Sequence, residues 1–225
     1  MEEIHARIAE HPKTFCNPLN LSYRFMKINE GGGIREAADP VVIPFKGRYF
    51  LFASKSGGYW HTQDFSHWTY VPISDAVMPI EDYAPGCFVY HQDLYYVGST
   101  HGKGMLYRSS NPEKGEWKKV REIDSGWDPA FFVEGDLLYM YHGCSPQSSI
   151  HVQVLELPSL EPKPKLMDCL NSDTQKHGWE RPGEHNERSQ RPYVEGAWMT
   201  KMRETTICNM PRQGQSGKPT LTESI

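Results

Sequence analysis

The sequence predicts an all-β fold of the β-propeller type, in which short antiparallel sheets repeat along the chain. Three stretches share one order: an acid or small residue, a proline, an apolar run, a polar turn and an aromatic run. They are DPVVIPFKGRYFLFAS (39–54), APGCFVYHQDLYYVGS (84–99) and DPAFFVEGDLLYMYHG (128–143). Their leading prolines are 45 and 44 residues apart, a period typical of four-stranded propeller blades. The 12 Tyr, 9 Phe and 6 Trp residues also favour strands.

The N-terminal part precedes the first repeat. Residues 1–16 are expected to form a polar arm, with Pro12 as a helix stop. This start lacks the apolar core of a signal peptide, so the chain as written is predicted to be cytoplasmic. A secreted or periplasmic location would follow if the true N-terminus lies upstream. Residues 17–28 have strand composition, and Glu30 to Gly33 supply a turn.

The first repeat reads as four strands. VVIPF and RYFLFA flank the turn residues Lys46 and Gly47, which indicates a hairpin. Two aromatic runs between Gly57 and Pro72 then surround a second turn at residues 63–66. The second repeat continues in the same way as strand, Asn-Pro turn and strand over residues 104–120.

The third repeat ends in a segment of different composition. Residues 148–157 alternate between apolar and polar side chains, as a half-buried strand does. Residues 158–191 are rich in Pro, Lys, Asn, Glu and His and are expected to form a long loop over one face. RPYVEGAWMTK (191–201) regains strand character and would open a fourth blade. Residues 17–201 are therefore predicted to be a partial propeller.

The tail, residues 202–225, differs from the rest of the chain. It lacks alternation, a hairpin and aromatic residues, and it does not continue the fourth blade. Codon choices exist that, read one nucleotide earlier, give an aromatic hairpin of the expected type. We therefore expect that the tail is aberrant and results from a frameshift near Lys201.

Composition excludes several classes of partner. The formal net charge is −4 with interspersed signs, so no basic stripe for nucleic acid and no polybasic membrane patch is present. No segment is long and apolar enough to span a membrane. The five cysteines are odd in number and form no C-x-x-C pair, which favours free thiols over a disulfide framework or a zinc knuckle. We expect a monomer.

Three carboxylates stand at corresponding points of the repeats. Asp39 and Asp128 precede apolar runs, and Glu195 opens the fourth blade. The innermost strands of a propeller begin around one axis, so these acids are expected to converge on a central pocket. Cleavage of a glycosidic bond needs one carboxylate to activate water and another to protonate the leaving oxygen. A third acid can raise the proton donor's pKa and orient it. An isolated Asp-Pro pair more often serves only to form a turn.

Together these motifs resemble one known family. The sequence ADPVVIPFKGRYFLFA, then YAPG, WDPAFF and YVEGAWMTK is similar to glycoside hydrolase family 43, over about residues 17–201. The resemblance implies a five-bladed propeller and inverting hydrolysis of arabinofuranosides, xylosides or galactofuranosides in oligosaccharides or polysaccharides. It implies that Asp39 is the general base and Glu195 the general acid. It also implies that Asp128 modulates the pKa of the general acid and orients it. Ala197 stands where the family often has proline, which bears on the subfamily.

The resemblance also sets expectations about completeness. A propeller of this family needs about 300 residues, so blade five and most of blade four are expected to be missing, with low stability and little activity. No cofactor and no metal are predicted. The alternatives are a noncatalytic glycan-binding propeller or pseudoenzyme, and a glycoside phosphorylase. A phosphorylase would need a basic pair facing the pocket.

Other residues are candidates for binding. Trp127, Tyr83 and Trp60 are predicted to stack on sugar, against the alternative of packing between blades. His177, Glu180, Glu184 and His185 lie in HGWERPGEHN, which lacks metal-ligand spacing and is expected to be a polar loop that rims the sugar pocket.

Overall fold

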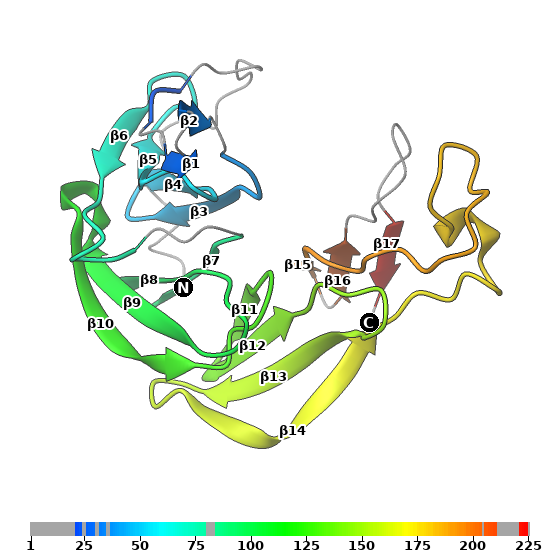
Figure 1. The fold of residues 1–225 in the computed structure, drawn as a ribbon. Coiled ribbons are helices and arrows are strands. Elements are labelled where there is room, and N and C mark those ends of the chain that lie inside the picture. Colours follow the sequence, from blue (N-terminus) through cyan, green and yellow to red (C-terminus); the bar gives the residue numbers. More distant parts are fainter. Residues whose placement is uncertain are drawn as a thin grey trace. The chain divides into compact units, whose positions relative to one another are not determined.

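The structure is a computed structural model that describes residues 21–23, 26–29, 32–34, 37–79, 84–203, 205–210 and 221–224. These residues form antiparallel sheets and two short 3₁₀ helices (Figure 1). The chain divides into two compact units. The first comprises residues 1–98 and 105–123, and the second comprises residues 99–104 and 124–225. The predicted arm, residues 1–16, lies outside the described residues.

The first unit holds two four-stranded sheets, as the repeats predict. One has the order β3 (Val41–Phe45), β4 (Arg48–Phe52), β5 (Gly58–Thr62) and β6 (Thr69–Pro72). The other has the order β10 (Glu116–Ile123), β9 (Gly104–Asn111), β8 (Asp93–Val97) and β7 (Gly86–Tyr90), with η1 (Pro112–Lys114) between β9 and β10. A small hairpin, β1 (Met26–Asn29) and β2 (Gly32–Ile34), precedes them. Lys46 and Gly47 have φ angles of 47° and 73°, which fits the predicted two-residue turn.

The core of the first unit is aromatic. The ring centroids of Phe52 and Tyr96, which come from β4 and β8, lie 5.2 Å apart, so the two sheets share one core. Tyr59 is fully buried, donates to the carbonyl of Pro112 and accepts a hydrogen bond of 2.9 Å from Trp117 Nε1. Burial raises the pKa of Tyr59 well above its usual value, so this hydroxyl stays protonated.

The second unit contains one four-stranded and one three-stranded sheet. The first has the order β11 (Ala130–Glu134), β12 (Leu137–His142), β13 (Ile150–Glu156) and β14 (Glu161–Leu170). The second has the order β15 (Trp198–Met202), β16 (Thr205–Met210) and β17 (Leu221–Ser224). Between them lies η2 (Gly178–Glu180). Buried Ile150, Val152, Val194 and Met199 join the two sheets in one cluster.

Two sequence expectations are wrong in this unit. Residues 161–170, expected in a long loop, form β14, a mostly exposed edge strand that tolerates its two prolines. The tail was expected to lack a hairpin, but β16 pairs with β15 and with β17. The frameshift stays a prediction. The described residues contain no helix long and apolar enough to cross a membrane.

Candidate active site

Asp39 stands at the entrance of β3 in an unusual backbone conformation. Its φ angle is 49°, in the left-handed region, although proline follows it. Its Oδ2 accepts a hydrogen bond of 3.1 Å from the Oγ of Ser54, a residue that is only 4% exposed. The backbone N–H of Ser54 also donates to the carbonyl of Ala38 at 2.9 Å. The end of β4 therefore fixes this exposed carboxylate.

Asp128 has the same local geometry in the second unit. Its φ angle is 51°, and it also precedes a proline. Its backbone N–H donates to the Oγ of buried Ser99 at 2.9 Å. Such a conformation costs about 1–3 kcal/mol and persists where the surroundings hold it. The two aspartates thus correspond in backbone conformation as well as in sequence position.

Glu195 is placed by a bridge between distant segments. Ser145 and Val194 form an isolated antiparallel β-bridge with N–H to O distances of 3.4 and 3.3 Å. Val194 and Ala197 are buried on either side of Glu195, at 1% and 4% exposure, which anchors the backbone. The Sγ of Cys144 then donates to Oε2 of Glu195 at 2.9 Å. This thiol contact was not foreseen from the sequence.

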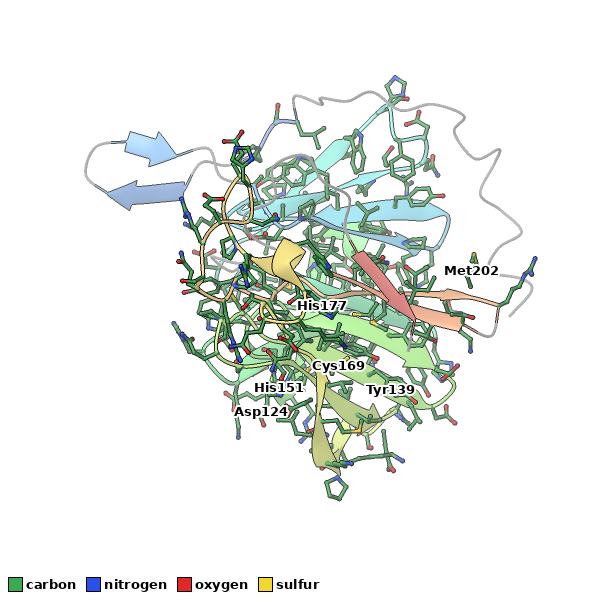
Figure 2. All side chains as sticks on the ribbon, turned by 90° about the vertical axis from the view of Figure 1, so that its right-hand side faces the viewer. Asp124, Tyr139, His151, Cys169, His177 and Met202 are labelled. Carbon is green, nitrogen blue, oxygen red and sulfur yellow. The ribbon has the colours of Figure 1, made fainter. Side chains whose placement is uncertain are left out.

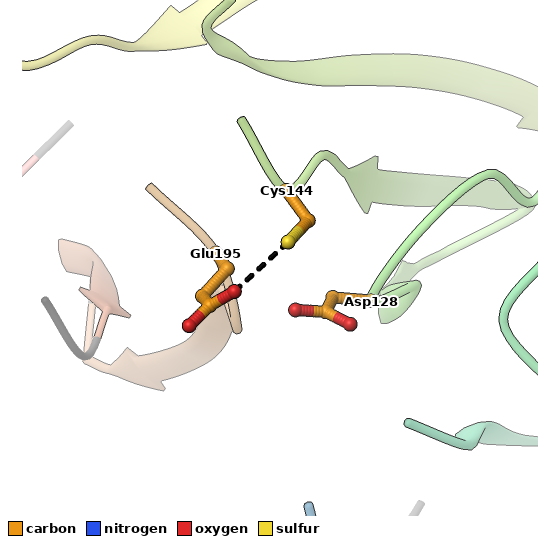
Figure 3. Close-up of side chains that lie close together, drawn as sticks. All are labelled: Asp128, Cys144 and Glu195. Atoms are coloured by element: carbon orange, nitrogen blue, oxygen red, sulfur yellow. Dashed lines mark hydrogen bonds between the residues drawn. The ribbon is translucent and has the colours of Figure 1, made fainter. Parts of the chain in front are cut away.

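Asp128, Cys144 and Glu195 form one half-buried cluster (Figure 3). One donor atom from each of the three lies within 4.8 Å of the others. Two carboxyl groups within this distance interact electrostatically, and the thiol fixes one oxygen of Glu195. Carboxylates with a thiolate are also a donor set that zinc accepts, so these three residues are the described ones that could hold a metal ion.

A periodic signal could have identified Cys144. Ser54, Ser99 and Cys144 are spaced 45 residues apart, and each is the second residue after the second strand of its sheet. Each contacts a predicted acid: Ser54 the carboxylate of Asp39, Ser99 the backbone of Asp128, and Cys144 the carboxylate of Glu195. The repeat therefore encodes a small polar side chain that positions an acid.

The three aromatic residues that were predicted to stack on sugar are treated in turn. Trp127 is half-buried, and its ring meets that of His101 edge-on at 4.6 Å, so its role in sugar binding stays a prediction. Trp60 is 2% exposed and its Nε1 donates to the carbonyl of Ser22 at 2.8 Å. The prediction that Trp60 stacks on substrate is wrong, because a buried indole offers no free face. Tyr83 lies outside the described residues.

The three acids are divided between the units. Asp128 and Glu195 belong to the second unit, and the structure brings them together as predicted. Asp39 belongs to the first unit, and its approach to this pair stays a prediction.

Comparisons with known proteins identify the fold. No protein-family model matches the chain. No curated protein sequence matches it either. Solved structures do match. A thermostable family-43 glycoside hydrolase has a TM-score of 0.62 at 19% identity, covering 89% of this chain and 67% of its own. An α-L-arabinofuranosidase from Clostridium thermocellum has a TM-score of 0.57 at 17% identity, covering 83% and 67%.

The arabinanase of Bacillus subtilis matches with a TM-score of 0.53 at 19% identity, covering 85% of this chain and 71% of that one. Against other glycoside hydrolases that match, the chain spans only 28% to 42% of their length. At these identities the likeness concerns the fold. The chain has the β-propeller fold of the family-43 glycoside hydrolases.

Proposed function

We propose that the chain is a glycoside hydrolase that cleaves O-glycosidic bonds in oligosaccharides or polysaccharides. The observation that carries the proposal is the half-buried pair of carboxylates, Asp128 and Glu195, at blade entrances of a glycosidase-type fold. Hydrolysis of a glycoside needs a carboxyl group that protonates the leaving oxygen, and a second acid nearby can orient it. Glu195 takes the first role and Asp128 the second.

The separation within this pair limits the roles that it can fill. Oxygens of Asp128 and Glu195 lie within 4.8 Å, whereas an inverting enzyme keeps its acid and base about 6.5–9.5 Å apart to leave room for water. Asp128 is therefore unsuited to be the base of an inverting reaction with Glu195. Asp39, which shares the local conformation of Asp128, is proposed as the base that activates water.

The proposed substrates are arabinofuranosides, xylosides or galactofuranosides. Support comes from the structures that share the fold, which include an arabinanase and an α-L-arabinofuranosidase. The three carboxylates supply the chemistry without selecting among these sugars, so the panel of substrates must be broad.

Two leaving groups test the roles separately. The purified chain, in excess over substrate, is assayed on dinitrophenyl glycosides and on the matching natural disaccharides. Glu195→Gln should lower the rate on disaccharides by about 10²- to 10⁴-fold and barely affect dinitrophenyl substrates, whose leaving group needs no proton. Asp39→Asn should lower both rates. Asp136→Asn, in the exposed turn between β11 and β12, is the control.

Each outcome is decisive. Equal loss on both leaving groups with Glu195→Gln would reject the general-acid role. Glycan binding without turnover by the unmodified chain would replace the proposal by a noncatalytic glycan-binding propeller.

A further inference from the structure

The segment between β14 and β15 contains a polar pocket that the proposed reaction does not use. Its volume is about 700 Å³. Ser172 and Thr174 are buried in its lining, at 3% and 8% exposure, whereas Arg181 and Arg191 are exposed at it. The remaining lining residues carry amide, hydroxyl or carboxylate groups. Figure 2 marks His177, at the start of η2 in this segment.

Hydrogen bonds brace the pocket before any ligand arrives. Buried Glu180 accepts the backbone N–H of Asp173 on Oε2 at 2.5 Å. Asp173 in turn accepts the backbone N–H groups of Gln175 and Lys176 on Oδ1, at 3.2 and 3.0 Å. These bonds close the segment upon itself, so the lining side chains need little further ordering to bind a ligand.

Arg181 is held in place by a hydrogen bond that does not use its two terminal nitrogens. Its Nε donates to the carbonyl of Thr174 at 3.1 Å, which fixes the plane of the guanidinium. No described residue forms an ion pair with Arg181 or with Arg191. Terminal guanidinium nitrogens in this state suit bidentate binding of a carboxylate.

A buried hydroxyl in the lining has no partner. Ser172 Oγ is shielded from solvent and makes no hydrogen bond within the described part of the chain. Buried polar groups are nearly always paired, so an unpaired hydroxyl in a pocket lining indicates a missing ligand or water. It is a second indication, independent of the arginines, that the pocket receives a polar molecule.

Asp173 indicates what else that molecule carries. The backbone N–H of Lys176 holds the pKa of Asp173 below its usual value, so the carboxylate is charged. A carboxylate accepts hydrogen bonds from sugar hydroxyls and repels a bare anion. Two cations with one anion and several neutral polar groups therefore suit a ligand with one negative charge and many hydroxyls.

We propose that this pocket binds a uronic acid residue of an acidic glycan, with the carboxylate on Arg181 and Arg191 and hydroxyls on Asp173 and Ser172. Arg191 precedes Glu195 by four residues, which span at most about 14 Å. The pocket is thus within reach of an oligosaccharide held at Glu195. The role of this pocket as a substrate subsite rests on the proposed glycosidase function, whereas its binding of a uronic acid does not depend on that function.

Binding to the full-length chain tests the proposal without turnover. Titration calorimetry compares D-galacturonate with D-galactose, in which a neutral hydroxymethyl group replaces the carboxylate, and with inorganic phosphate. Galacturonate should bind, and Arg181→Gln and Arg191→Gln should each weaken it about tenfold to a hundredfold, as expected for a charge-assisted hydrogen bond. Arg188→Gln, on the same segment but outside the pocket lining, should leave affinity unchanged.

The remaining outcomes overturn the proposal. Equal affinity for galactose would reject the role of the carboxylate, and tighter binding of phosphate would make the pocket an anion site. Equal weakening by Arg188→Gln would reject the site itself, as would no binding. Among the described residues, the side chain of Arg191 accounts for no hydrogen bond like that of Arg181 to the Thr174 carbonyl, so the Arg191 variant separates binding from folding. If galacturonate binds but the chain hydrolyses none of the glycosides, only the proposed glycosidase function is rejected.

Discussion

Removal of the Cys144 thiol should impair the proposed general acid. The Sγ of Cys144 lies 2.9 Å from Oε2 of Glu195, within the distance allowed for a sulfur donor. Glu195 becomes charged when it gives its proton to the leaving group, and hydrogen bonds to charged groups contribute about 1.5–3 kcal/mol; because a thiol is a weak donor, we assign about 1 kcal/mol to this contact in the transition state. That corresponds to a rate about fivefold lower for Cys144→Ala on substrates that need the acid. Cys144→Ser keeps a donor and should recover most of the loss.

The contact can also be measured without turnover. Glu195→Gln alters the group that accepts the hydrogen bond of the Cys144 thiol, so it should change the rate at which iodoacetamide alkylates Cys144. Peptide mass mapping follows each cysteine separately. Cys169, which is also half-buried and lies outside the cluster, should react at an unchanged rate.

Two results would refute this reasoning. If Cys144→Ala and Cys144→Ser lowered the rate equally, the loss would come from packing instead of the donor. If Glu195→Gln left the alkylation rate of Cys144 unchanged, the two side chains would not be in contact in solution.

Three further predictions concern stability. Tyr59→Phe removes the acceptor of the buried Trp117 indole N–H, while the Pro112 carbonyl keeps its bond from the N–H of Gly115, so the free energy of unfolding in urea should fall by about 1–3 kcal/mol. Gly58→Ala places a Cβ 2.4 Å from the carbonyl oxygen of Val71 and should cost about 1–3 kcal/mol. Burial, with His151 nearby, lowers the pKa of His142 below 6.5. The unfolded state therefore binds more protons, and stability should fall as pH drops below about 6.5.

Each of these predictions has a matched control. Tyr193→Phe removes a hydroxyl that is exposed and should leave stability unchanged. Gly102→Ala adds a Cβ that meets nothing within 4 Å. His142→Gln removes the titrating group, so its stability should vary less between pH 5 and 7; an unchanged slope would assign the effect to other groups.

The blades were predictable because their signal is local and repeated. Strand, turn and strand recur with the same chemistry, and the two-residue turn at Lys46 and Gly47 sets the register of its hairpin. The strand β14 was missed because an edge strand faces solvent and needs no apolar alternation, so Pro162 and Lys163 in it look like loop residues. The pairing of β16 was missed because it depends on β15 as a partner and not on its own composition.

The acids were predictable from repeat position, whereas their partners were not. Asp39 and Asp128 both precede proline at a strand entrance, and the shared φ angle shows that this reflects one backbone geometry. The contact of Cys144 with Glu195 joins residues 51 apart through the bridge at Ser145 and Val194. Strand patterns do not encode such a bridge. Trp60 was misjudged because composition does not distinguish a buried indole from an exposed one.

The 45-residue spacing of Ser54, Ser99 and Cys144 suggests why sulfur stands at the third position. The first two hydroxyls lie against aspartates, whose short side chains stay near the backbone. Glu195 has a longer side chain, and the longer bonds of a thiol extend the reach of a small residue without changing the backbone. The hydrogen bond to Glu195 therefore places a reactive residue type in a structural role.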